Sequence, residues 1–125
     1  MKSEERRVKN FPLLFSLFLT LKKESIMSAK TIIESGKAIL GIEFGSTRIK
    51  AVLIDTDNNP IAQGSFEWEN QLVDGLWTYS IDTIWKGLQD CYADLRKNVK
   101  AEYDCEIKQL AAIGISAMMH GYMAF

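Results

Sequence analysis

The chain has 125 residues, of which 47% are hydrophobic and 25% charged, and its formal net charge is -1. This composition is typical of one soluble globular domain, and the near-neutral charge argues against a nucleic-acid-binding protein. Cys91, Cys105 and a single histidine are too few for a disulfide framework or a Cys/His zinc site. We therefore expect a protein with reduced thiols, located in the cytoplasm.

The first thirty residues are more basic than the rest, with seven Lys/Arg against three Asp/Glu, whereas the remainder has eight against thirteen. Their apolar run, residues 11–21, is about half as long as the ~20 residues that a membrane-spanning helix needs. The run is followed by Lys22-Lys23-Glu24-Ser25, which is not the small-residue site at which a secretory signal is cleaved. We therefore predict no stable membrane span.

Residues 1–37 are best separated from the folded domain, which we predict over residues 38–125. The first segment is expected to be a leader that is poorly ordered or that results from an over-extended translation start, since Met27 would make a natural start of its own. Two alternatives stay open: a signal-like or membrane-surface leader, and an extra helix docked on the domain.

Three strands are predicted at the start of the domain. An apolar run over residues 38–43 ends in a carboxylate, residues 48–55 alternate polar and β-branched side chains, and residues 61–68 form a third run. Turn-forming residues separate them at 45–47 and at 57–59. This order predicts a three-stranded antiparallel meander.

A loop is expected over residues 69–80, followed by a helix with Ser80 or Asp82 as its N-cap. One face of this helix is apolar: Ile81, Ile84, Trp85, Leu88, Cys91, Tyr92, Leu95 and Val99. The unalternating apolar run 110–115 predicts a fourth strand that is buried on both faces. A crossover helix between the third and fourth strands is typical of mixed α/β sheets. The predicted fold is therefore α/β and ribonuclease-H-like (actin-like ATPase), truncated after the fourth strand.

The first candidate site is the turn Gly45-Ser46-Thr47. Its backbone N–H groups and hydroxyls can bind an anion, because glycine lets an anion approach the backbone closely. Glu43, at the end of a buried strand, could hold a divalent cation, and Lys50 could pair with a terminal phosphate. A plain hairpin that uses glycine and serine for its geometry explains the same residues equally well.

The second candidate site is Met119-His120-Gly121, just beyond the fourth strand, where open α/β sheets place their ligands. A neutral imidazole can form a hydrogen bond with a polyol hydroxyl, and methionine can pack against the carbon face of a sugar. An isolated histidine, however, is more often a satisfied loop or core residue, and methionines more often belong to the core.

The two sites together resemble motifs of the FGGY family of carbohydrate kinases, and the resemblance covers residues 38–125. Gly41–Lys50 is similar to the phosphate-binding hairpin of this family, and Gly114–Gly121 is similar to the Gly-Gln-Met-His-Gly motif of its xylulokinase-like members. Trp77 and Trp85 resemble the tryptophans that flank the start of the intervening helix. The resemblance implies a sugar kinase that uses ATP and Mg²⁺ on a ketopentose or related polyol.

The resemblance also assigns roles to single residues. Phosphate binding falls to Gly45, Ser46, Thr47 and Lys50, the magnesium site to Glu43, and sugar binding to Met119, His120 and Gly121. Four positions depart from the family pattern: Glu43 stands for aspartate, Met118 for glutamine, and Tyr79 and Ile81 for residues that are commonly acidic. The general-base aspartate is expected beyond Phe125, so we predict that the chain alone is inactive.

The partners implied are a sugar and ATP, and the resemblance is compatible with a homodimer of the full-length protein. Two other functions are considered: a non-catalytic remnant, and another actin-like ATPase without sugar specificity. The kinase interpretation requires that the turn after the first strand and the loop after the fourth strand lie on the same side of the sheet.

Overall fold

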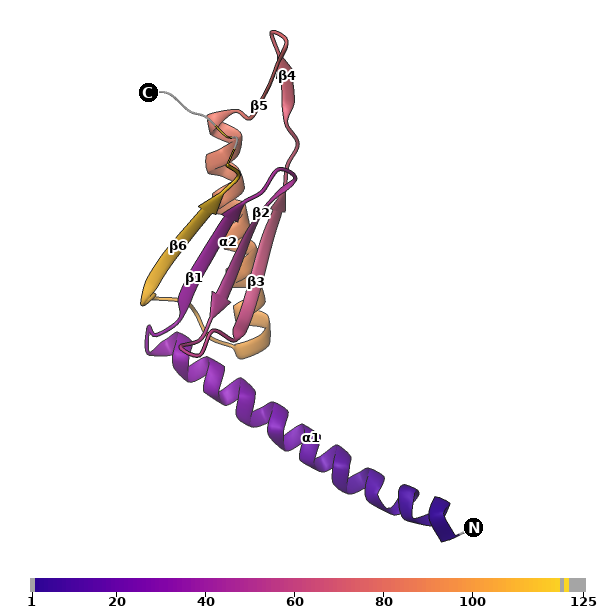
Figure 1. Cartoon of the computed structure of the whole chain (residues 1–125). Helices are drawn as coiled ribbons and strands as arrows, with labels where there is room; N and C mark the ends of the chain where they lie inside the picture. Colours follow the sequence, from indigo (N-terminus) through magenta and orange to yellow (C-terminus); the bar gives the residue numbers. More distant parts are fainter. Residues whose placement is uncertain (1, 120, 122–125) are drawn as a thin grey trace.

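The computed structural model describes residues 2–119 and 121 (Figure 1). A four-stranded sheet carries one helix on one face, and a two-stranded hairpin and a long N-terminal helix project from it. The elements in chain order are α1 (Lys2–Glu34), β1 (Ile39–Phe44), β2 (Arg48–Ile54), β3 (Pro60–Glu67), β4 (Gln71–Val73), β5 (Leu76–Thr78), α2 (Ile81–Tyr103) and β6 (Ala112–Ala117).

The main sheet has the strand order β3-β2-β1-β6, with antiparallel pairs except for β1 and β6, which run parallel. The predicted three-stranded meander is thereby confirmed. Its second turn is held by Asp55, whose Oδ1 accepts hydrogen bonds from the N–H groups of Asp57 (2.9 Å) and Asn59 (2.8 Å). Asn58 has φ +65°, a conformation that asparagine tolerates better than most residues.

Helix α2 packs across β2 and β3 and forms the core with them. Ser80 is its N-cap, as predicted, and the Ser80 Oγ accepts the N–H of Thr83 at 3.1 Å. The predicted apolar face is buried at Cys91, Leu95 and Val99. Ile81 and Trp85 belong to the same face but are exposed, because no described element covers that side of the first turns.

The outer edge of β3 is closed by side chains of α2. Each forms a hydrogen bond with one backbone group of the strand: Asp94 with the N–H of Ser65 (3.1 Å), Asn98 with the C=O of Gln63 (2.8 Å) and Tyr103 with the C=O of Ile61 (2.8 Å). Alternate residues of an antiparallel edge strand direct both backbone groups outward, so these bonds occupy one of the two outward groups of each of these residues and compete with a further strand.

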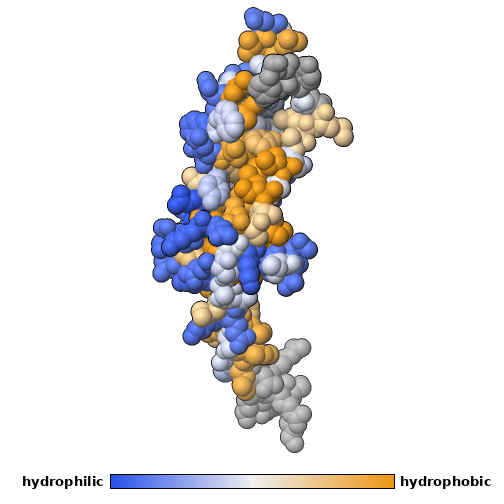
Figure 2. Space-filling view, turned by 90° about the vertical axis from the view of Figure 1, so that its left-hand side faces the viewer, coloured by the Kyte–Doolittle hydropathy of each residue, from blue (hydrophilic) through white to orange (hydrophobic). Residues whose placement is uncertain are grey.

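The prediction that the fourth strand is buried on both faces is wrong. Ile113 and Ile115 of β6 are 59% and 69% exposed. The strand lies at the edge of the sheet, and α2 packs mainly on β2 and β3 rather than on β6, so the apolar side chains of β6 are only partly covered by described residues. Figure 2 shows apolar surface on this side of the molecule.

The predicted loop over residues 69–80 is also wrong in part, because it contains the hairpin β4–β5. Asp74 and Gly75 form its two-residue turn with φ values of +50° and +79°. Positive φ at both central positions matches the twist of a tight hairpin and favours Asp-Gly. The sequence contained this signal, since Asp74-Gly75 stands between Val73 and Leu76.

The segment expected as a leader forms α1, which extends away from the domain (Figure 1). Its side chains are exposed over residues 12–25. They include large apolar groups: Leu13, Leu14, Phe15, Leu17, Phe18, Leu19 and Leu21. Of the helices in the described part of the chain, none combines the length and the apolar character that crossing a membrane requires.

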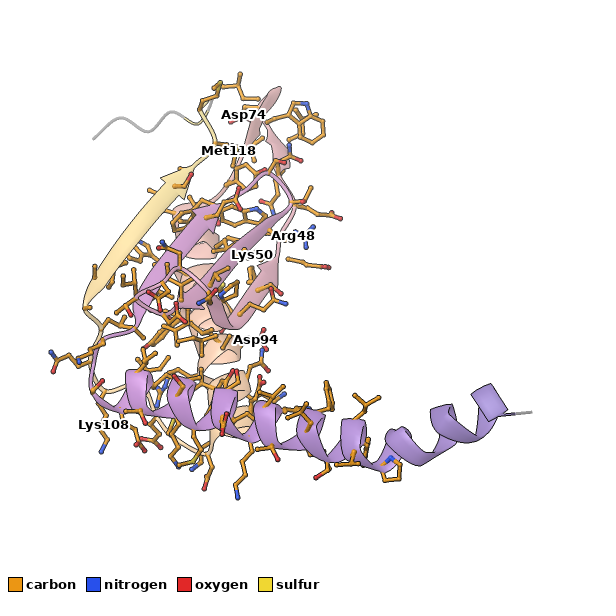
Figure 3. The ribbon with its side chains drawn as sticks, turned by 60° about the horizontal axis from the view of Figure 1, so that its bottom comes forward. Arg48, Lys50, Asp74, Asp94, Lys108 and Met118 are labelled. Carbon is orange, nitrogen blue, oxygen red and sulfur yellow. The ribbon has the colours of Figure 1, made fainter. Side chains whose placement is uncertain are left out.

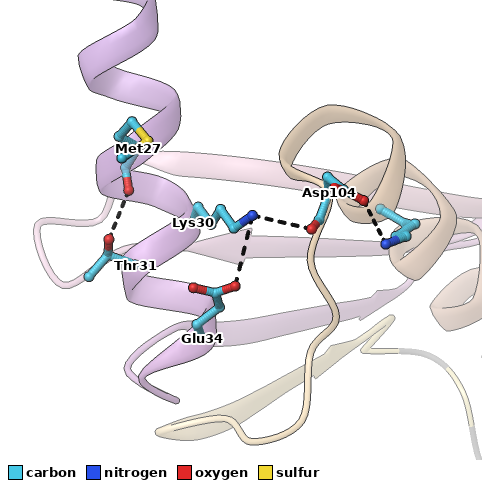
Figure 4. A network of polar contacts seen from close by, with 6 residues as sticks. Met27, Lys30, Thr31, Glu34 and Asp104 are labelled. Atoms are coloured by element: carbon cyan, nitrogen blue, oxygen red, sulfur yellow. Dashed lines mark hydrogen bonds and ion pairs between the residues drawn. The ribbon is translucent and has the colours of Figure 1, made fainter.

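Among the side chains of α1 that the structure describes, those of the last turns pack against the domain. Ile33 is 1% exposed and belongs to the core. Lys30 Nζ donates a hydrogen bond to the backbone oxygen of Asp104 (3.3 Å) and approaches Glu34 at 4.0 Å, and the Asp104 carboxylate pairs with Lys100 at 2.6 Å (Figure 4). This part of α1 is a docked helix, which was one of the alternatives left open by the sequence.

Candidate functional site

The turn between β1 and β2 consists of Gly45, Ser46 and Thr47. The Gly45 N–H donates to the carbonyl of Arg48 at 2.9 Å, which closes the turn. A Cβ atom on Gly45 would lie 3.0 Å from that same oxygen, so glycine permits the tight geometry. The side chains of Ser46 and Thr47 are exposed.

All three carbonyl oxygens of this turn accept hydrogen bonds from two aromatic residues. The Gly45 oxygen accepts from the indole Nε1 of Trp68 (2.9 Å), and the Thr47 oxygen accepts from the backbone N–H of Trp68 (3.1 Å). The Ser46 oxygen accepts from the hydroxyl of Tyr79 (2.6 Å). No described group accepts a hydrogen bond from the N–H of Ser46 or Thr47. The turn therefore has occupied acceptors and available donors.

The two aromatic residues are themselves fixed by packing. Trp68 is 6% exposed, and its ring centroid lies 4.7 Å from that of Tyr79 and 6.2 Å from that of Phe44. Tyr79 directly precedes Ser80, the N-cap of α2. Sequence reasoning did not assign Trp68 or Tyr79 to the site, because no local pattern reports a contact with a turn more than twenty residues away.

Glu43 and Lys50 face each other across β1 and β2 as Cα partners, on the side of the sheet opposite α2. With Gly41, Gly114 and Ser116 they line a shallow hollow of about 440 Å³. Arg48 lies on the same face as Lys50, because alternate residues of a strand share a face (Figure 3). The turn therefore has two basic side chains beside it.

Glu43 is the predicted magnesium ligand. Among the residues that the structure describes, no three acidic, cysteine or histidine groups come together in a way that could hold a metal ion. Glu43 is an exposed carboxylate without an ion pair to another described residue. Such a lone carboxylate fits Mg²⁺, which usually keeps several waters and binds one or two carboxylates together with phosphate oxygens of a substrate.

The loop after β6 begins next to this turn. β1 and β6 run parallel with Phe44 opposite Ala117, and the Met118 N–H donates to the Phe44 carbonyl at 3.2 Å. The carboxyl ends of both strands therefore meet at one edge of the sheet, where Met118 is labelled in Figure 3. The two loops begin on the same side, which is the arrangement that the kinase interpretation requires.

Of the predicted sugar-binding residues, Met119 is 97% exposed. The Gly121 N–H donates to the Met118 carbonyl at 3.3 Å, which closes a short turn. His120 lies outside the described residues. The structure thus brings Met119 and Gly121 to the same edge of the sheet as the turn Gly45–Thr47. Chemically, this edge offers backbone donors, hydroxyls, cationic side chains and one carboxylate, a set that suits a phosphate with a divalent cation.

Comparisons with known proteins agree with this geometry. The model of the FGGY family of carbohydrate kinases, N-terminal domain, matches residues 38–125. The solved structure of a xyloylose kinase from Brucella ovis is 26% identical with a TM-score of 0.56, and the match covers 67% of this chain and 17% of that one. The solved structure of a gluconate kinase from Lactobacillus acidophilus is also 26% identical, with a TM-score of 0.52, and the match covers 66% of this chain and 16% of that one. No curated protein matches the chain.

The chain spans about a sixth of the length of these two solved kinases, 17% and 16%. The similarity extends over the sheet and α2, and it confirms the predicted α/β fold of the ribonuclease-H-like, actin-like ATPase class.

Proposed function

Because the chain belongs to the FGGY family of carbohydrate kinases, we propose that it forms the phosphate-binding turn and part of the sugar site of an ATP-dependent sugar kinase. The observation that supports this proposal is that two candidate binding loops begin at the same edge of the sheet. The donor-rich turn after β1 and the loop after β6 both begin there, joined by the hydrogen bond from Met118 to Phe44.

In this proposal the turn binds a phosphate of ATP. The N–H groups of Ser46 and Thr47 and the two hydroxyls donate to phosphate oxygens, and Lys50 adds a positive charge on the neighbouring strand. Glu43 would hold Mg²⁺, which would supply positive charge against the phosphate oxygens. These contacts position the phosphate, which is the main requirement of phosphoryl transfer.

The acceptor in this proposal is a ketopentose or a related polyol, bound by Met119, His120 and Gly121. The xylulokinase-like sequence of this loop supports a xylulose-like sugar, while Met118 removes the amide that such enzymes carry there. The general base is an aspartate downstream of Phe125, so we propose that the chain by itself transfers no phosphoryl group. Reduced thiols and the sugar and ATP substrates support a cytoplasmic location.

The experiment that tests this function uses the full-length protein encoded by the reading frame continued beyond Phe125. Purified protein is assayed with Mg²⁺ and ATP for ADP release in the presence of pentuloses, polyols and gluconate, with the 125-residue chain in parallel. We expect sugar-dependent ADP release from the full-length protein alone. ATP hydrolysis without sugar dependence would instead support an actin-like ATPase, and no turnover with any sugar would support a non-catalytic remnant.

Two substitutions separate the phosphate site from the sugar site in the same assay. Lys50→Met should raise the KM for ATP about tenfold or more while the KM for sugar stays the same, because a charge-assisted contact to phosphate is lost. His120→Ala should instead raise the KM for sugar and leave the KM for ATP the same. Lys97→Met on the solvent-exposed side of α2 is the matched control, since it removes an equal charge far from the turn. Equal effects of His120→Ala on both KM values would contradict the sugar-site assignment.

A further inference from the structure

We propose that Trp68 and Tyr79 are positioning residues that fix the turn Gly45–Thr47 with its backbone donors toward the phosphate. This inference rests on the proposed function of the turn. It assigns a role to two residues that make no contact with phosphate themselves and act only through the carbonyl oxygens they bind.

The direction of the donors follows from peptide geometry. In a planar trans peptide the C=O of one residue and the N–H of the next point in opposite directions. Trp68 Nε1 binds the Gly45 oxygen, so the N–H of Ser46 points away from the indole. Tyr79 binds the Ser46 oxygen, so the N–H of Thr47 points away from the phenol. Two hydrogen bonds to carbonyls therefore set the direction of two consecutive donors.

The same bonds keep acceptors away from the anion. A carbonyl oxygen carries partial negative charge, so a turn whose peptide units rotate would present a repulsive group to phosphate. Trp68 also binds the Thr47 oxygen through its backbone N–H, which completes the set of three occupied carbonyls. A turn of this kind is preorganised, and a preorganised turn binds its ligand more tightly because less ordering accompanies binding.

Both donors lie next to the end of a regular element and are held by contacts there. The Trp68 ring packs against Phe44 and Tyr79, and Trp68 directly follows β3. Tyr79 is adjacent to the N-cap residue Ser80, whose hydroxyl oxygen is bonded by the Thr83 N–H. The turn is therefore held from two elements, the end of β3 and the start of α2.

Conservative substitutions can remove each bond and keep an aromatic side chain at the position. Tyr79→Phe removes the hydroxyl donor, and Trp68→Phe removes the indole N–H. Tyr103→Phe is the matched control, because the Tyr103 hydroxyl donates a bond of similar kind to the Ile61 carbonyl (2.8 Å) at the opposite end of β3. A loss of general stability affects all three variants, whereas a loss of turn geometry affects only the first two.

The test is made on the full-length protein with two measurements, steady-state kinetics and calorimetric binding of MgADP. Tyr79→Phe and Trp68→Phe should each weaken MgADP binding and raise the KM for ATP about three- to tenfold, the range expected for one hydrogen bond, with the KM for sugar unchanged. Tyr103→Phe should lower the thermal midpoint without changing either KM.

The outcomes separate the inference from the proposed function. If the wild-type protein phosphorylates a sugar and both Tyr79→Phe and Trp68→Phe keep its ATP KM and MgADP affinity, the inference is wrong and the function stands. If the wild type binds MgADP but phosphorylates no sugar, the function is wrong, and the MgADP affinities of the variants still decide the inference. Absence of MgADP binding by the wild type would overturn both.

Discussion

At the scale of single residues, burial controls the chemistry of both thiols. Cys91 Sγ lies 3.5 Å from the carbonyl oxygens of Ile49 and Gly64, and burial is the main cause that raises the pKa of this thiol. Burial also raises the pKa of Cys105. The folded chain thus retains these protons at a pH at which the unfolded chain loses them. The free energy of unfolding should therefore fall as pH rises above about 8.5, the usual thiol pKa.

The same burial predicts low thiol reactivity. The thiolate is the nucleophile, so iodoacetamide at pH 8.5 should modify Cys91 and Cys105 at least about tenfold more slowly in the native protein than in urea. Peptide mass spectrometry over a time course measures both rates. The unfolded chain in the same buffer is the control, and equal native and unfolded rates for Cys91 would contradict its burial.

At the scale of elements, the close approach of α2 to β3 depends on Gly64. A Cβ atom at this position would lie 2.4 Å from the backbone N of Leu95 and 2.5 Å from the carbonyl oxygen of Cys91. These are backbone atoms, which cannot move without moving the helix. The absence of a side chain at Gly64 therefore permits the close packing of α2 on β3.

Gly64→Ala should therefore lower the free energy of unfolding by about 1–3 kcal/mol, the usual effect of overpacking. Urea titration followed by circular dichroism measures this change. Gly114→Ala on the uncovered face of β6 is the matched control, since a Cβ atom there meets nothing within 4 Å. Equal free energies for both variants would show that α2 shifts at no cost.

Elements with strong local signals could be predicted from the sequence. The meander, the helix and its Ser80 cap each depend on neighbouring residues, and all were predicted. The burial of β6 was predicted wrongly, because an apolar run does not reveal which elements cover it. The roles of Trp68 and Tyr79 were missed for a similar reason, since they depend on the distance between β3, α2 and a turn far away in the sequence.

At the scale of the whole molecule, α1 divides into an exposed arm and a docked end. Residues 12–25 are exposed, whereas Ile33 lies in the core beside β-sheet residues such as Leu40 and Leu53. The contribution of α1 to stability should therefore come from its last turns. Its arm instead adds apolar surface, which promotes association between molecules.

Deletion of residues 1–25 should leave the free energy of unfolding within about 0.5 kcal/mol of the original value and increase solubility. Ile33→Ala in the complete chain should lower it by about 2–4 kcal/mol, because a fully buried isoleucine is truncated. Urea unfolding and sedimentation measure stability and association. A large loss of stability on deletion of the arm would contradict its exposed position.

The two edges of the main sheet differ in how open they are to pairing with a further strand. Asp94, Asn98 and Tyr103 each occupy one outward backbone group of β3, so a further strand would compete with α2 for these groups. The border at β6 carries no such cap among the described residues. The open edge for another segment of polypeptide, whether from the same protein or from a neighbour, is therefore Ala112–Ala117, the strand that leads into the proposed sugar-binding loop.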